Sequence, residues 1–233
     1  MKRFVTILMG AFMLSQSCFA KGNNVYIVYY ATFKGKTGHA GIALDKYKVV
    51  YREVQEPGGV KQVADTIATG ELVYYDLWPD DDFFNVRNTG KNIPALYYKL
   101  PVSASEEITL NSLFDKGIPH REHYPSDGLL RIRTSWQQDQ QLIRLLDSMV
   151  IANRPFNARL FNCTDFVRIA IEQLLNVELR SKEFILAGWS TTPNKFYRAL
   201  RKLKEVEVIK NADDKASCSF IRHRVLYKFF HRS

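Results

Sequence analysis

The sequence predicts an α+β fold in which an antiparallel sheet packs against helices. Segments rich in Val, Ile and Tyr dominate the first half of the chain, segments with helical apolar periodicity dominate the second, and a strand-like segment closes it. The chain has 233 residues and contains no internal repeat. A length of this order suits a single domain with a substantial core.

The first twenty residues have the pattern of a secretory signal peptide. Two basic residues precede an apolar run that is too short to span a bilayer, and small residues lead to Ala20. We therefore expect residues 1–20 to be removed and residues 21–233 to form one exported domain without a transmembrane segment. Lipid attachment at Cys18 is an alternative, which Ser15 disfavours because a leucine is typical there.

The expected strands are rich in β-branched and aromatic residues and are bounded by turn residues. They span 24–33, 39–45, 48–55, 70–79, 94–103 and 219–230. A glycine-containing turn at 34–38 precedes the second strand, and a tight link at 46–47 separates the second from the third. Two segments, around 56–70 and 79–130, are expected to be insertions into the domain.

Three helices are expected, each with a recognisable start. They span 134–153, 164–176 and 191–205. Ser135 and Gln138 form a capping-box pattern at the first. Thr164 and Asp165 open the second, and Pro193 lies near the start of the third. In the second helix one face is formed by Phe166, Ile169, Ala170, Gln173 and Leu174 and is broadened by Val167 and Ile171, which predicts that the helix packs on the sheet.

The charge balance favours acidic partners. The formal net charge is +9, and the predicted signal peptide holds two of the 33 basic residues and none of the 24 acidic ones, which leaves +7. Cell-wall polymers and anionic lipid head groups fit this charge. Export and the scattered distribution of the basic residues argue against nucleic acid as a partner. The basic cluster at 222–232 is mixed with core-type residues and is expected to be a solvated strand edge.

Cys163 is a candidate nucleophile. It precedes an apolar helix pattern, where free backbone N–H groups and the helix dipole favour an anion. A thiol in that position can titrate below its usual pKa of ~8.5. The number of cysteines also allows a disulfide between Cys163 and Cys218, because these two cysteines remain after the signal peptide is removed.

A cysteine nucleophile needs a base, which is usually a histidine. His39 is the best candidate because it stands at the first position of an expected strand, directly after a glycine turn. Its small neighbours Gly38, Ala40 and Gly41 allow another element to approach closely. The alternative is a buried histidine with a purely structural role.

The other four histidines make weaker candidates. His120 and His123 lie in a proline-flanked loop, where two ligands without a third nearby make a poor metal site, so we expect both to face solvent. His223 and His231 are expected to be structural residues of the last strand. We therefore expect neither a metal nor another cofactor.

Taken together, "GHAGIALD" (38–45) and "NCTDFV" (162–167) resemble the circularly permuted branch of the NlpC-type, papain-like cysteine hydrolases. In that branch the histidine strand precedes the cysteine helix. Related permuted groups include the lecithin:retinol acyltransferase-like enzymes and bacterial cell-envelope amidases and acyltransferases. The resemblance covers the two motifs and the order of elements, and it implies a papain-like fold.

The resemblance implies that Cys163 is the nucleophile, that His39 is the general base, and that a polar residue on a neighbouring strand orients the imidazole. Glu53 is our expected third residue, because it lies on the expected partner strand at 48–55 with the parity that lets it face His39, and a carboxylate best stabilises imidazolium. Tyr51 shares that parity, and Asp76 becomes the candidate if its strand is the neighbour. An exposed strand glutamate without a catalytic role is the alternative for Glu53.

Two further roles follow from the resemblance. The backbone N–H of Cys163 would donate to an oxyanion, and Tyr29 or Tyr30 would supply another contact, although core positions suit both tyrosines. Because a nucleophile cannot be locked in a disulfide, Cys218 is then expected to be a free or buried thiol.

The expected function is that of an exported monomeric thiol hydrolase in the periplasm or cell envelope of a bacterium. It would cleave amide bonds in peptidoglycan-derived or other small peptides through an acyl-enzyme. One alternative is a lipid amidase or acyltransferase that uses the same cysteine on a lipid-linked substrate. The other is a catalytically inactive wall-binding module, which a separation of about 5 Å or more between the Cys163 sulfur and the His39 ring would favour.

Overall fold

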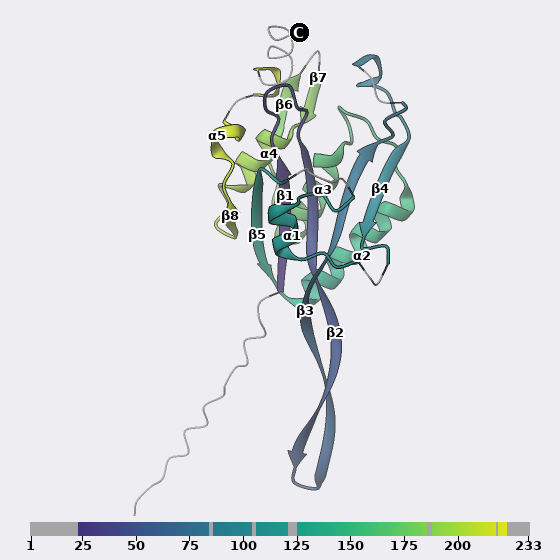
Figure 1. Ribbon diagram of the computed structural model, residues 1–233, viewed down its shortest axis with the longest axis vertical. Coiled ribbons are helices and arrows are strands. Elements are labelled where there is room, and N and C mark those ends of the chain that lie inside the picture. The colour runs from purple at the N-terminus through teal and green to yellow at the C-terminus, as the bar shows by residue number, and fades with distance from the viewer. Residues whose placement is uncertain are drawn as a thin grey trace, which may run out of the picture.

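The computed structural model describes residues 23–83, 86–103, 106–120, 125–185, 188–217 and 219–222. Within them, six strands form one antiparallel sheet in the order β4-β3-β2-β1-β5-β8 (Figure 1). These strands are β1 (Asn23–Tyr30), β2 (His39–Glu56), β3 (Gly59–Pro79), β4 (Ala95–Leu100), β5 (Gly128–Thr134) and β8 (Val206–Lys210). A separate ladder pairs β6 (Lys182–Ile185) with β7 (Gly188–Thr191). The helices are α1 (Leu110–Asp115), α2 (Trp136–Ala152), α3 (Cys163–Leu175), α4 (Pro193–Leu200) and α5 (Asp213–Ala216), with a 3₁₀ turn at Val86–Asn88.

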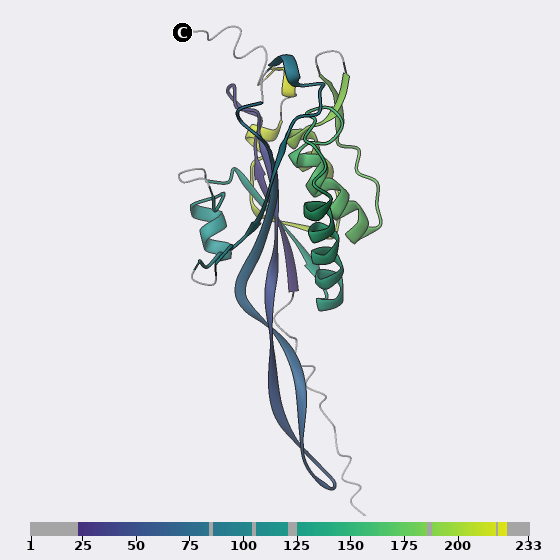
Figure 2. The same cartoon turned by 90° about the vertical axis from the view of Figure 1, so that its right-hand side faces the viewer.

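The expected α+β architecture is confirmed, and both faces of the sheet are covered. In Figure 2, α2 and α3 lie on one face and α1 lies on the other. Alternate residues of β1 serve the two faces: Ile27 and Tyr29 pack in the core under α2, α3 and α4, whereas Tyr26, Val28 and Tyr30 pack in the core under α1. This double burial explains why the β1 sequence is apolar or aromatic at nearly every position.

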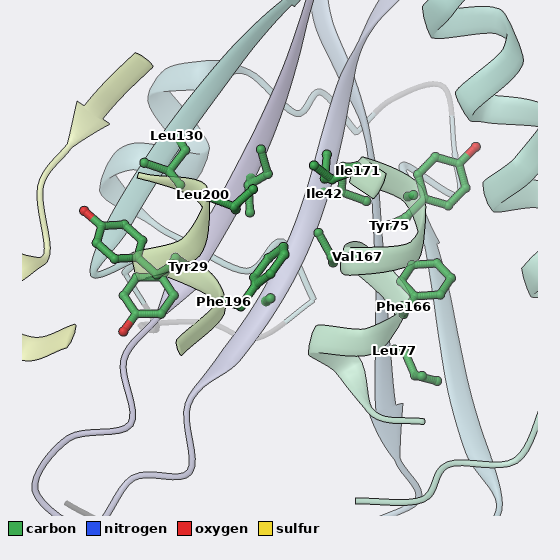
Figure 3. Packing of buried hydrophobic residues seen from close by; sticks show 14 of the residues in the cluster. Tyr29, Ile42, Tyr75, Leu77, Leu130, Phe166, Val167, Ile171, Phe196 and Leu200 are labelled. Atoms are coloured by element: carbon green, nitrogen blue, oxygen red, sulfur yellow. The ribbon is translucent and has the colours of Figure 1, made fainter. Parts of the chain in front are cut away.

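Helix α3 packs on the sheet through Phe166, Val167 and Ile171, which lie close to Ile42 and Tyr75 of the strands (Figure 3). The buried face differs slightly from the expected one. Val167 and Ile171, expected at its margin, are fully buried, whereas Ile169 and Leu174 are only partly buried. The helix is therefore rotated a little about its axis relative to the expected orientation.

The helix starts follow the sequence signals closely. Ser135 caps α2 and forms the expected box with Gln138. Helix α3 begins one residue earlier than expected, at Cys163, because the N-cap is Asn162 and its box partner is Asp165. Helix α4 begins at its expected proline. These local signals are sufficient because each satisfies backbone amides within three residues of the cap.

The first half of the chain differs from the expectation in two respects. The segments 39–45 and 48–55 are a single strand, β2, with a bulge between Asp45 and Tyr47. The expected insertion at 56–70 is a tight turn followed by the first half of β3. The outer parts of β2 and β3 pair only with each other and form a long hairpin that projects from the sheet (Figure 1).

The second half contains strands that were not expected, namely β5, β6, β7 and β8. Within the segment 79–130, β4 matches the expected strand at 94–103, whereas α1 and the start of β5 were not expected. The last strand of the sheet is β8 rather than 219–230. Phe220–Arg222 is helical, not extended. The remainder of that expected strand, the signal peptide and Cys218 lie outside the described residues. No helix within the described part of the chain is long and apolar enough to cross a membrane.

Gly41 is a close-approach position that supports the site, and its replacement should be costly. A Cβ added there would lie 2.2 Å from the hydroxyl oxygen of Tyr74. We expect Gly41→Ala to displace Tyr74 and lower the free energy of unfolding by about 1–3 kcal/mol, as overpacking of a core does. Chemical denaturation would measure this loss. Gly90→Ala is the matched control, because its added Cβ would come no closer than 3.5 Å to a neighbouring side chain; equal losses in both variants would contradict the prediction.

Candidate active site

The thiol of Cys163 stands at the first residue of α3. The side chain of Asn162 accepts hydrogen bonds from the amides of Thr164 (2.9 Å) and Asp165 (3.2 Å). Asn162 also donates to the carbonyl of Thr191 (3.1 Å), and the Thr191 hydroxyl donates to Asp165 (2.6 Å). The start of α3 is thereby fixed to the end of β7. Cys163 is a free, half-buried thiol.

His39 is held by the turn before it and by the strand that follows. It pairs with Tyr30 of β1 at the first position of β2. Gly38 has φ +78°, and a Cβ there would lie 2.8 Å from the backbone nitrogen of Thr32, so the turn requires glycine. The imidazole is 3 % exposed and stacks on Trp78 with 4.2 Å between ring centroids. The ring is thus fixed in both position and plane.

The structure places the Cys163 thiol and the His39 imidazole close enough for the charge of each to shift the pKa of the other. Burial alone would lower the pKa of His39, but the negative charge of Cys163 and the carboxylate of Asp76 raise it to about 9. Burial would raise the pKa of Cys163, but the charge and hydrogen bond of His39 lower it below its usual value. The favoured pair is therefore thiolate and imidazolium.

Asp76 of β3 is the carboxylate that binds the imidazole. It is fully buried and accepts from His39 Nε2 (3.0 Å), the Tyr74 hydroxyl (3.0 Å) and Trp78 Nε1 (2.7 Å). Burial would raise the pKa of Asp76, but the hydrogen bonds from His120 and His39 lower it to about 2. An ionised Asp76 makes His39 Nε2 a donor, which leaves Nδ1 as the nitrogen available to Cys163.

The structure places Glu53 and Tyr51 away from the site, which corrects our expectation for the third residue. Glu53 is exposed on the projecting hairpin, where it pairs with Gln62, and Tyr51 is 71 % exposed there. Glu53 is fourteen residues beyond His39 on the same strand, a distance of roughly 46 Å at about 3.3 Å per residue. The parity of Glu53 was misleading, because 48–55 continues the strand of His39 and is not its partner. The strand that lies beside His39 is the second half of β3.

His120 is a component of the site that the sequence did not indicate. It was expected to face solvent, but its side chain is only 12 % exposed, and Nε2 lies 3.1 Å from both carboxylate oxygens of Asp76. Its ring stacks on Tyr98 with 3.7 Å between centroids. No local pattern signals this contact, because it joins a loop to a strand 44 residues earlier. His123 lies outside the described residues.

Other groups near the sulfur have distinct roles. The Asn162 cap takes up the amides of Thr164 and Asp165 but not that of Cys163, so the Cys163 N–H suits an oxyanion donor. The Tyr29 hydroxyl donates to Asn194 (2.6 Å) in the core and does not face an oxyanion, whereas the Tyr30 ring lies 5.9 Å from that of His39.

Among the described residues, no group of three or more His, Cys, Asp or Glu side chains is arranged to hold a metal ion.

A pocket of about 110 Å³ opens beside Cys163. Its walls are mostly apolar and come from the turn before β2, the loop before α3, and the segment that joins β6, β7 and α4. The residues that line the pocket include Gly38, Phe156, Arg159, Cys163, Ile185 and Thr191. Gly38 also precedes His39, so a substrate group in this pocket would lie beside the thiol–imidazole pair.

The raised pKa of His39 can be tested directly. We expect the His39 ring signals in NMR spectra to titrate with a midpoint near pH 9. In Cys163→Ala the midpoint should fall, because the negative charge of the thiolate contributes most to raising the pKa of His39. Without that charge, burial of the imidazole lowers its pKa with less opposition. An ordinary midpoint near 6.5 in the unmodified protein, or the same midpoint in both proteins, would contradict this electrostatic coupling.

Comparison with known protein families, with curated proteins and with solved structures gives no match. The assignment of chemistry therefore depends on the geometry of the site.

Proposed function

We propose that this chain is a cysteine hydrolase that cleaves amide bonds through Cys163 and His39, with Asp76 as the positioning carboxylate. The contact of a helix-terminal thiol with a buried imidazole, which is itself bonded to a buried carboxylate, carries this proposal. A nucleophile, a base and a group that orients the base are the three elements that acyl transfer requires. The same contact argues against a purely wall-binding module.

The proposed reaction has two steps. The Cys163 thiolate attacks the amide carbonyl carbon, and the His39 imidazolium gives its proton to the departing amine as the C–N bond breaks. The imidazole then takes a proton from water, whose oxygen attacks the thioester and releases the acid and the thiolate. Asp76 stays ionised throughout and holds the tautomer of His39. The Cys163 amide stabilises the oxyanion in both steps.

A permuted papain-like fold is part of the proposal. A cysteine helix that follows a histidine strand and packs on an antiparallel sheet supports it. The signal-peptide pattern and the net charge of +7 that remains without that peptide support an exported protein in a bacterial cell envelope that acts on acidic, peptidoglycan-derived or other small peptides.

The test is a product analysis with a matched variant. Purified protein and Cys163→Ala are incubated with peptidoglycan fragments, and the products are identified by mass spectrometry. We expect new amine and acid termini only with the unmodified protein, and a thioester adduct on Cys163 after rapid acid quenching. Identical products from both proteins, with Cys163→Ala shown to be folded by circular dichroism, would refute the proposal.

Acyl transfer to an acceptor other than water is the second candidate, and the apolar walls of the pocket favour it. In this case the thioester on Cys163 would pass its acyl group to an added amine or alcohol. Transfer products that exceed the free acid when such an acceptor is present would favour this candidate, which uses the same residues.

A further inference from the structure

We propose that the pocket beside Cys163 selects substrates that carry a carboxylate next to the scissile carbonyl, and that Arg159 is the residue that binds it. The inference rests on the proposed role of Cys163 as the nucleophile. It adds the position of the acidic group in the substrate, next to the scissile carbonyl, and the residue that recognises it.

The position of Arg159 supports this role. Among the described residues that line the pocket, Arg159 is the only basic side chain. Its side chain passes between Gly90, on the loop before β4, and Gly188, the first residue of β7. A Cβ at Gly90 would lie 3.5 Å from its guanidinium carbon, and a Cβ at Gly188 would lie 3.4 Å from its Cδ. The guanidinium therefore lies between these two backbone segments, at the pocket.

The backbone beneath Arg159 is fixed. The side-chain oxygen of Asn157 accepts from the amides of Arg159 (3.0 Å) and Leu160 (3.1 Å). Asn157 is itself 3 % exposed and donates to Asn92 (2.9 Å) on the loop that contains Gly90. The loop that carries Arg159 is therefore tied to the loop that contains Gly90, and the cation is presented from a fixed base.

The chemistry of the pocket favours a carboxylate as the ligand. A guanidinium forms two parallel hydrogen bonds to a carboxylate, and these bonds are stronger between mostly apolar walls than in water. No acidic side chain among the described lining residues would attract a cationic substrate.

Two alkylating reagents of nearly equal size test the proposal. Iodoacetate carries a carboxylate and iodoacetamide a neutral amide, and mass spectrometry would quantify each adduct on Cys163 at pH 7. The measured quantity is the ratio of the iodoacetate rate to the iodoacetamide rate. We expect Arg159→Met to lower this ratio about tenfold, with the iodoacetamide rate changed less than twofold. Because the His39 imidazolium attracts iodoacetate in every variant, the difference between variants isolates Arg159.

Arg154→Met is the matched control. Arg154 lies on the same loop, and its guanidinium packs over the Phe161 ring (4.3 Å) rather than lining the pocket. We expect this variant to keep the ratio of the unmodified protein. Arg159→Lys, which keeps the charge but not the planar fork, should fall between the unmodified protein and Arg159→Met.

The outcomes separate this inference from the proposed function. An unchanged ratio in Arg159→Met, or an equal fall in Arg154→Met, overturns the carboxylate site even if iodoacetamide reacts rapidly. Slow reaction of iodoacetamide with the unmodified protein overturns the proposed function itself. If Arg159→Met disturbs the fold, the ratio in Arg159→Lys decides: a ratio equal to that of the unmodified protein contradicts bidentate recognition, and a lower ratio supports it.

Discussion

Replacement of His39 by glutamine is expected to reduce the alkylation rate of Cys163 by iodoacetamide at pH 6 at least tenfold. The side-chain amide of glutamine can still donate to Asp76, so the buried carboxylate keeps a partner, but the cation that lowers the pKa of Cys163 is lost. A thiol with an ordinary pKa of ~8.5 is only about 0.3 % ionised at pH 6. The lower intrinsic nucleophilicity of a low-pKa thiolate offsets only part of this difference.

His120→Gln is the matched control for this variant. It makes the same chemical change at the other imidazole on Asp76, but His120 does not contribute to the lowered pKa of Cys163. We expect its alkylation rate to change less than threefold. A His39→Gln rate within twofold of the unmodified protein would show that the imidazole does not hold the thiol as a thiolate.

Replacement of Asp76 by asparagine is expected to destabilise the fold more than any other single change considered for the site. The carboxylate is fully buried and accepts from His39, His120, Tyr74 and Trp78. An amide is neutral and turns an N–H₂ group toward some of these donors. Breaking a buried charged network of this kind costs about 3–5 kcal/mol, which for a domain of this size lowers the Tm by roughly 6–20 °C.

Asp147→Asn provides the comparison. Asp147 accepts from the Tyr75 hydroxyl (2.9 Å) and from Lys99 (2.7 Å), but it is 34 % exposed, so water replaces lost contacts and the expected cost is about 1 kcal/mol or less. Calorimetry of the two variants would measure both values. A Tm for Asp76→Asn no lower than that for Asp147→Asn would mean that the buried network contributes little to stability.

The sequence was sufficient to predict the two motifs because each is local. The turn before His39 requires glycine for its positive φ, and the polar residues around Cys163 cap the helix within three positions. The α+β order also followed from local periodicity. These signals place a histidine at a strand start and a cysteine at a helix start, and the structure brings the two into contact.

The remainder of the site depends on which distant segments pair. Glu53 and Asp76 both follow strand patterns, and only the register of β2 with β3 shows that Asp76 lies beside His39 while Glu53 lies on the hairpin. The contact of His120 with Asp76 and the addition of β8 to the sheet edge are likewise long-range. Such pairings are set by packing of the whole core, which a single strand pattern does not encode.

The central claim is that folding holds Cys163 as a thiolate beside a protonated His39, and the most direct measurement is the thiolate absorbance at 240 nm as a function of pH. The difference between the unmodified protein and Cys163→Ala removes the signal of Cys218 and of the aromatic residues. We predict that this difference rises with a midpoint clearly below pH 8.5, the value of a free thiol. A midpoint at or above pH 8.5 would contradict the account.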